Sequence, residues 1–156
     1  MKKIEYIVIF LIIFFPLISS SQDFEVSPVK MYFRINPGET ETKILTIKNH
    51  FNFKTPFTIT FEDFVIDKDG NTQSIPRNSS KTSCTEWITP EKTFFDVDPN
   101  EQVEIKLTMQ APENDYSTRW AVMHIQTAKV QTSFDADKSG IGAGVHLSGR
   151  IGVYIY

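Results

Sequence analysis

Between Val103 and Met109, apolar and polar side chains alternate without a break, and few patterns restrict a fold as strongly. The apolar members are Val103, Ile105, Leu107 and Met109, and the residues between them are Glu104, Lys106 and Thr108. Successive side chains of a β-strand point to opposite faces of its sheet, so this pattern predicts a strand with one buried face. An α-helix would scatter the apolar set around its surface.

Similar segments recur along the chain, with turn residues between them and no convincing apolar period of 3.6 residues. The clearest predicted strands cover 24–35, 40–49, 57–62, 103–109, 118–127 and 145–156, and shorter apolar groups lie at 87–88 and 94–97. About seven strands at this spacing predict an all-β fold, an antiparallel two-sheet sandwich of immunoglobulin type.

Local signals divide these segments. Proline cannot donate to a strand ladder, so Pro28 is predicted to mark an edge or a switch between sheets inside the first segment. Turns are predicted at 36–39, 67–71 and 98–101, where proline, glycine, asparagine and aspartate gather. The polar stretch 72–85 predicts an exposed loop with at most a short strand.

The N-terminus has the order of a cleavable signal peptide. Lys2 and Lys3 precede an apolar run that is shorter than the roughly 20 residues of a membrane span, and the small residues Ser19 and Ser21 follow. We expect residues 1–21 to be removed and 22–156 to form a periplasmic or secreted domain without a stable membrane span. An uncleaved N-terminal anchor is the alternative, because Glu5 dilutes the basic segment and the cleavage site lacks alanine.

Composition limits the function classes. About 135 residues remain after cleavage, which is enough for one domain with one core. The net charge of −3 is spread without runs of one sign, so neither a nucleic-acid partner nor a basic membrane surface is indicated. The single cysteine, Cys84, excludes an internal disulfide. The core must therefore suffice, and the 13 phenylalanines suit that demand.

Candidate catalytic residues are few. The imidazoles are His50, His124 and His146, and no serine lies in a Gly-x-Ser-x-Gly elbow. Cys84 lacks a nearby positive charge apart from Lys81, so a passive cysteine is expected. His124 lies in an apolar strand and is expected to be a satisfied core or interface histidine. No catalytic residue, enzyme activity or cofactor is predicted.

Two segments resemble the start of a calcium loop, at 67–70 and 135–140. In the second, the position that should carry a bidentate glutamate is His146, and no predicted helices flank it. Both segments are therefore predicted to be solvated turns, and no metal ligand is assigned.

The last predicted strand is longer than the usual 5 to 6 residues or so. One parity of it carries a row of apolar side chains, which Gly149 interrupts: Val145, Leu147, Ile151, Val153 and Ile155. The row is either ordinary core or a surface that something must cover, because an exposed apolar strand is prone to aggregate. A protein partner could cover it by adding a strand.

Several short segments agree in order and spacing with a known family. They are Val26-Ser27-Pro28, 36–39, Ile47-Lys48-Asn49, Pro56, Asp98-Pro99, 120–125 and 150–156. In this order they resemble the N-terminal domain of periplasmic pilus-assembly chaperones, over nearly all of the predicted mature chain. Each segment alone also occurs in other immunoglobulin-like domains.

The resemblance implies a binding function. In that family the last strand of this domain donates alternating apolar side chains to an incomplete fibre subunit, which here would be the row from Val145 to Ile155. Two basic residues anchor the subunit's C-terminal carboxylate, and the matching residues would be Lys30 and Arg150. The alternative for this pair is that both are ordinary solvated strand residues.

One departure from the family leaves two hypotheses. The chaperones have a second immunoglobulin-like domain, and the subunit lies between the two domains, whereas this sequence stops at Tyr156. The first hypothesis is a chaperone-like domain that binds a surface-fibre or adhesin subunit, with an outer-membrane usher as a further candidate partner. The second is a structural immunoglobulin-like module of a cell-surface assembly.

Overall fold

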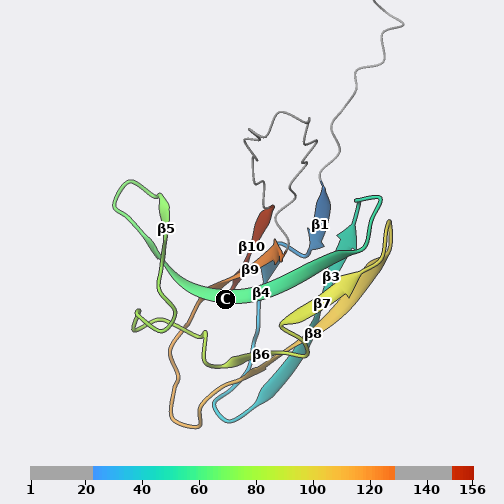
Figure 1. Ribbon diagram of the computed structural model, residues 1–156. Helices are drawn as coiled ribbons and strands as arrows, with labels where there is room; N and C mark the ends of the chain where they lie inside the picture. Colours follow the sequence, from blue (N-terminus) through green and yellow to red (C-terminus); the bar gives the residue numbers. More distant parts are fainter. Residues whose placement is uncertain (1–22, 129–148) are drawn as a thin grey trace, which may run out of the picture.

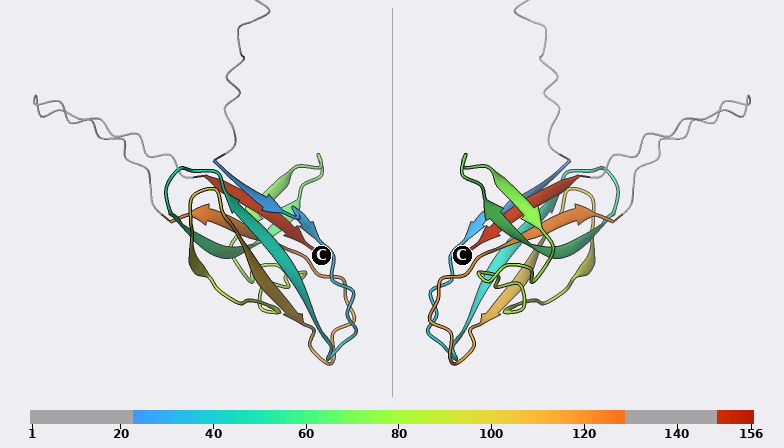
Figure 2. Two further views of the ribbon diagram at one scale, coloured as in Figure 1. Left: turned by 90° about the vertical axis from the view of Figure 1, so that its right-hand side faces the viewer. Right: turned by 90° about the vertical axis from the view of Figure 1, so that its left-hand side faces the viewer.

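A computed structural model of the chain describes residues 23–128 and 149–156. Within these residues there are ten strands and no helix (Figure 1). They form two sheets that pack as a sandwich, so the predicted all-β fold is confirmed (Figure 2). The predicted signal peptide lies outside the described residues.

The two sheets have different widths. The strands are β1 (Phe24–Ser27), β2 (Lys30–Met31), β3 (Thr40–Asn49), β4 (Thr55–Ile66), β5 (Thr72–Ile75), β6 (Ile88–Pro90), β7 (Phe94–Val97), β8 (Gln102–Gln110), β9 (Ala121–Thr127) and β10 (Arg150–Ile155). One sheet has the order β1-β3-β8-β6. The wider sheet has the order β2-β10-β9-β4-β5, with β7 also paired to β4. Of these pairings, only that between β2 and β10 is parallel.

The predicted switch at Pro28 is confirmed. Before it, β1 pairs with β3 in the four-stranded sheet, and after it, β2 pairs with β10 in the wider sheet. A second crossing separates β6, which pairs with β8, from β7, which pairs with β4. The described strands outnumber the predicted seven because the first segment divides and because short strands such as β5 also pair.

The core follows the alternation. Leu45 and Ile47 of β3 and Leu107 of β8 are fully buried, whereas Ile44, on the other face of β3, is about half exposed. Rings of Phe24, Phe57 and Phe95 contact one another in the core, with centroids 5.2 Å apart for Phe24–Phe57 and 6.1 Å apart for Phe57–Phe95. Burial of such rings removes much apolar area from water, which stabilises a domain that has no disulfide.

Asn49, at the end of β3, is a fully buried polar residue. Its Nδ2 donates to the carbonyl oxygens of Phe53, Val97 and Asp98, at 3.0, 2.9 and 3.2 Å. Its Oδ1 accepts from the backbone nitrogen of Phe51 at 2.9 Å. One side chain therefore joins the loop after β3 to the turn between β7 and β8.

We expect Asn49→Ala to lower the free energy of unfolding by about 3 kcal/mol, because it leaves buried carbonyl groups without donors. Urea denaturation measures the change. Lys48→Ala, at the exposed neighbouring position, is the matched control and should stay within about 0.5 kcal/mol of wild type. Equal losses in the two variants would contradict the assigned role of Asn49.

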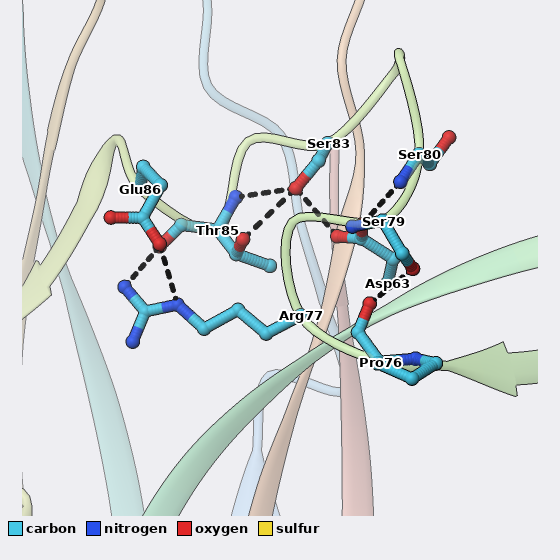
Figure 3. A network of polar contacts seen from close by, with 8 residues as sticks. All are labelled: Asp63, Pro76, Arg77, Ser79, Ser80, Ser83, Thr85 and Glu86. Atoms are coloured by element: carbon cyan, nitrogen blue, oxygen red, sulfur yellow. Dashed lines mark hydrogen bonds and ion pairs between the residues drawn. The ribbon is translucent and has the colours of Figure 1, made fainter.

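The polar stretch after β5 is less exposed than predicted. Asp63 of β4 is fully buried and accepts hydrogen bonds from the backbone nitrogens of Ser79 and Ser80, at 2.8 and 2.9 Å, and from Ser83 Oγ at 2.5 Å (Figure 3). Ser83, Cys84 and Thr85 are buried as a result. The prediction of an exposed loop at 72–85 is therefore wrong for its last part, because a buried carboxylate holds the backbone against the core.

Removing this carboxylate should free the loop. We expect Asp63→Ala to speed trypsin cleavage after Arg77 and Lys81, since the backbone nitrogens that Asp63 binds lie between these two sites. Limited proteolysis with mass spectrometry measures the effect. Asp69→Ala, in the exposed turn at 67–71, is the control, and similar cleavage of both variants would count against this role of Asp63.

Candidate functional site

The last strand is paired along only part of its length. On one side, β10 pairs with β9 from Arg150 to Ile155. On the other side, β2 covers only its end, where the backbone nitrogens of Tyr154 and Tyr156 donate to Val29 and Met31, at 3.0 and 2.9 Å. In the described part of the chain, no strand pairs with this second side at 150–153. Among the described residues, the beginning of β10 therefore has an open edge on this side.

The predicted donor row points into the protein's own core. Val153 and Ile155 are 0% exposed, and Ile151 is partly buried against the same core. Val145 and Leu147 lie outside the described residues. In this structure Ile151, Val153 and Ile155 pack against the core of the sandwich itself, and their donation to a partner stays a prediction.

The opposite parity of β10 faces outward and joins an aromatic cluster. We call this set the outer aromatic cluster: Tyr32, Phe64, Trp120, Tyr154 and Tyr156. Phe64 is 2% exposed, and its ring centroid lies 5.2 Å from that of Tyr154 and 6.3 Å from that of Tyr156. Tyr32 stacks on Tyr156 at 5.3 Å and remains 56% exposed. The cluster therefore ends in an exposed aromatic rim beside β2.

Three polar side chains lie on the same outer face, one on each of three adjacent strands. Arg150 Nη2 of β10 is 2.5 Å from Glu62 Oε1 of β4. His124 Nε2 of β9 is 3.2 Å from Glu62 Oε2, whereas its buried Nδ1 has no hydrogen-bond partner in the described residues. His124 is buried as expected, at 9% exposed. The ring lies beside Gly152, where a Cβ would be 3.6 Å from Nδ1, an ordinary van der Waals contact.

These contacts set the charges of the three groups. The hydrogen bond from Arg150 lowers the pKa of Glu62, which outweighs the opposing effect of partial burial. Burial lowers the pKa of His124, and the Arg150 charge lowers it further. At neutral pH the outer face therefore carries an ion pair beside a neutral imidazole.

The two predicted anchors are not brought together. In register, Lys30 lies opposite Tyr154, which is four residues from Arg150, or roughly 13 Å along the strand. Arg150 already forms an ion pair with Glu62, whereas no ion pair of Lys30 is found among residues 23–128 and 149–156. Both side chains share the outer face, and their role as carboxylate anchors stays a prediction.

The other candidate sites carry little chemistry. Burial raises the pKa of Cys84 to about 12, so its thiolate is scarce at neutral pH. In the described part of the chain, no three His, Cys, Asp or Glu side chains are grouped to hold a metal ion. Asp67 accepts hydrogen bonds from the backbone nitrogens of Asp69 and Asn71, so this segment is a closed turn. The segment 135–140 and His146 lie outside the described residues.

None of the described residues forms a helix that could cross a membrane.

Comparisons with known proteins support the fold. No family model matches the chain, and no curated protein matches it. A structure of the Salmonella enterica SafA pilin with the SafB chaperone is similar at a TM-score of 0.53 and 11% identity, over 88% of this chain and 54% of that one. The chaperone–tip adhesion subunit complex CsuC–CsuE of Acinetobacter baumannii gives 0.51 and 12%, over 86% and 57%. This chain thus spans about half the length of those chains.

A third similar structure is a single domain. The PapD-like domain 7 of human CEP192 gives a TM-score of 0.50 and 11% identity, over 90% of this chain and 89% of that one. At such identities the likeness establishes the fold and nothing finer. The fold is PapD-like and of immunoglobulin type, as the sequence resemblance implied.

The lowered pKa of His124 makes the stability depend on pH. The unfolded chain binds this proton near the ordinary pKa of 6.5, before the folded state does, so the free energy of unfolding should fall as the pH drops from about 7.5 to 5.5. Urea denaturation across this range measures the slope. His124→Gln should flatten it, while His50→Gln controls for the loss of a histidine elsewhere. An unchanged slope in His124→Gln would contradict the assignment.

Proposed function

We propose that this chain is an exported, non-catalytic binding domain that holds a protein partner as an added strand on the open edge of β10. The partner that best fits is a surface-fibre or adhesin subunit, so the activity is chaperone-like. The observation that carries the proposal is that, among residues 23–128 and 149–156, no strand pairs with β10 at 150–153 on the side away from β9. The PapD-like fold, shared with structures that contain pilus chaperones, supports it.

The direction of the backbone groups supports strand addition. The backbone nitrogen of Tyr154 donates to Val29, away from β9, while the carbonyl of Gly149 accepts from Thr127 on the β9 side. Main-chain groups alternate in direction along a strand, so the backbone N–H and C=O groups of Arg150 and Gly152 point toward the open edge. An extended segment placed there would continue the line of β2 and bond to these groups.

The outward side chains would supply the specificity. Because the inward row closes the core, a partner strand at this edge would meet the outer face, with the exposed ring of Tyr32 and the basic groups of Lys30 and Arg150. Aromatic rings and cations suit a partner segment that carries apolar side chains and a carboxylate. This arrangement replaces the predicted donor row and keeps both predicted basic residues.

The cellular setting is part of the proposal. Export depends on the predicted signal peptide at 1–21, and a periplasmic location follows if the host is a Gram-negative bacterium. An outer-membrane usher would then be a second partner. Genes for a fibre subunit and an usher beside the gene for this chain would support this setting.

Replacing the Gly152 backbone donor tests strand addition. We expect Gly152→Pro to lower the affinity for a co-expressed fibre subunit, encoded by a neighbouring gene, about tenfold or more. The substitution removes a main-chain donor and places a ring at the edge. Gly152→Ala is the matched control, since it adds a Cβ 3.3 Å from Val122 Cγ2 but keeps the donor. Affinities are measured by titration calorimetry after urea denaturation confirms folding. Equal affinities of the two variants would defeat the proposal.

A structural module of a surface assembly is the second candidate. The alignment over 89% of the CEP192 structure favours it, because that structure is a PapD-like domain of a larger protein. In that case the chain would stay in the mature assembly. A chaperone would instead be absent from purified fibres, so immunodetection in isolated fibres separates the two functions.

A further inference from the structure

Arg150, the basic residue at the start of the open edge, already forms an ion pair with Glu62 of this same chain. We propose that Glu62 competes with the partner for Arg150, and that protonation of His124 releases Arg150 to bind a partner carboxylate at mildly acidic pH. This inference rests on the proposed function and adds a regulation to the same site.

The geometry places the three groups in one contact chain. Glu62 lies on β4, His124 on β9 and Arg150 on β10, and the carboxylate has one oxygen at each base, 2.5 Å from Arg150 Nη2 and 3.2 Å from His124 Nε2. Ser74 of β5 also hydrogen bonds to Glu62. The Arg150 side chain is 43% exposed, so an anion from solvent or from a partner can reach it.

The charged groups that act on His124 are Glu62 and Arg150. Its direct cross-strand neighbours, Thr60 on β4 and Gly152 on β10, carry no charge. Val122 and Gln126, the same-face neighbours on its own strand, are also uncharged. Besides burial, which has the largest effect, one carboxylate and one guanidinium therefore govern the proton on this imidazole.

Charge balance explains the release. With a neutral imidazole, Glu62 and Arg150 compensate each other. A proton on His124 leaves two cations for one carboxylate, and Nε2 already lies within reach of Glu62 Oε2. The imidazolium and guanidinium repel each other, so Arg150 gains from an external anion. By linkage, an anion bound at Arg150 must in turn favour the proton on His124.

NMR spectroscopy of the exported chain tests this coupling with acetate as the carboxylate probe. In the wild type, the Arg150 Nε–Hε signal should shift with the same pH midpoint as the His124 ring. At equal acetate-ion concentration, the acetate-induced shift at Arg150 should be about fivefold larger at pH 5.5 than at pH 7.5. Acetate should also raise the pH midpoint of His124.

Matched variants identify the competitor and the switch. Glu62→Gln should strengthen the acetate response of Arg150 at pH 7.5, because the competing carboxylate is gone, and His124→Gln should leave the response weak at both pH values. His124→Asn serves as a second variant if the first does not fold. An Arg150 signal that ignores the titration of His124, or a wild-type acetate response that is the same at both pH values, would overturn the inference.

The Gly152→Pro variant separates this inference from strand addition. It removes the edge donor but keeps Glu62, His124 and Arg150, so its pH-dependent acetate response should persist. If that response persists while Gly152→Pro and Gly152→Ala bind the fibre subunit equally, the proposed function fails and the charge coupling stands. If subunit binding discriminates the two variants but Arg150 ignores pH, the coupling fails alone.

Discussion

Burial of apolar side chains between two sheets, without a covalent link, is the constraint on which the other features of this protein depend. The chain has a single cysteine, so no internal disulfide can hold the sheets together. Strands of both sheets must then contribute to the core, and β10 does so with Val153 and Ile155. The inward parity of the last strand is therefore committed to stability.

This commitment moves the candidate function to the outer face and the edge. The main-chain groups of Arg150 and Gly152 point away from β9, and the outward side chains carry aromatic rings and charges. These outward groups are not part of the core, because they lie where the strand is open or partly covered. A sandwich of this kind can bind through one strand while the same strand completes its interior.

Much of the fold was predictable because it depends on local patterns. Alternation located β3 with the observed bounds, and the proline at 28 marked the switch between sheets. The aspartate–glycine turn at 67–71 was also correct. The candidate site was less predictable. Lys30 and Arg150 were selected as basic residues of the right strands, but the partner of Arg150, Glu62, is 88 residues away in sequence. No local pattern reports such a pairing.

By itself, the sequence determined which residues form strands and which side chains of a strand share a face, since period two is a property of the local backbone. Only the tertiary structure decided which face of β10 is inside, because that depends on the strands beside and across from it. It also decided that Phe64 joins Tyr154 and Tyr156, that Asp63 holds the loop at 79–83, and that Glu62 meets Arg150. These contacts join residues far apart in the chain, so they exist only once the sheets have formed.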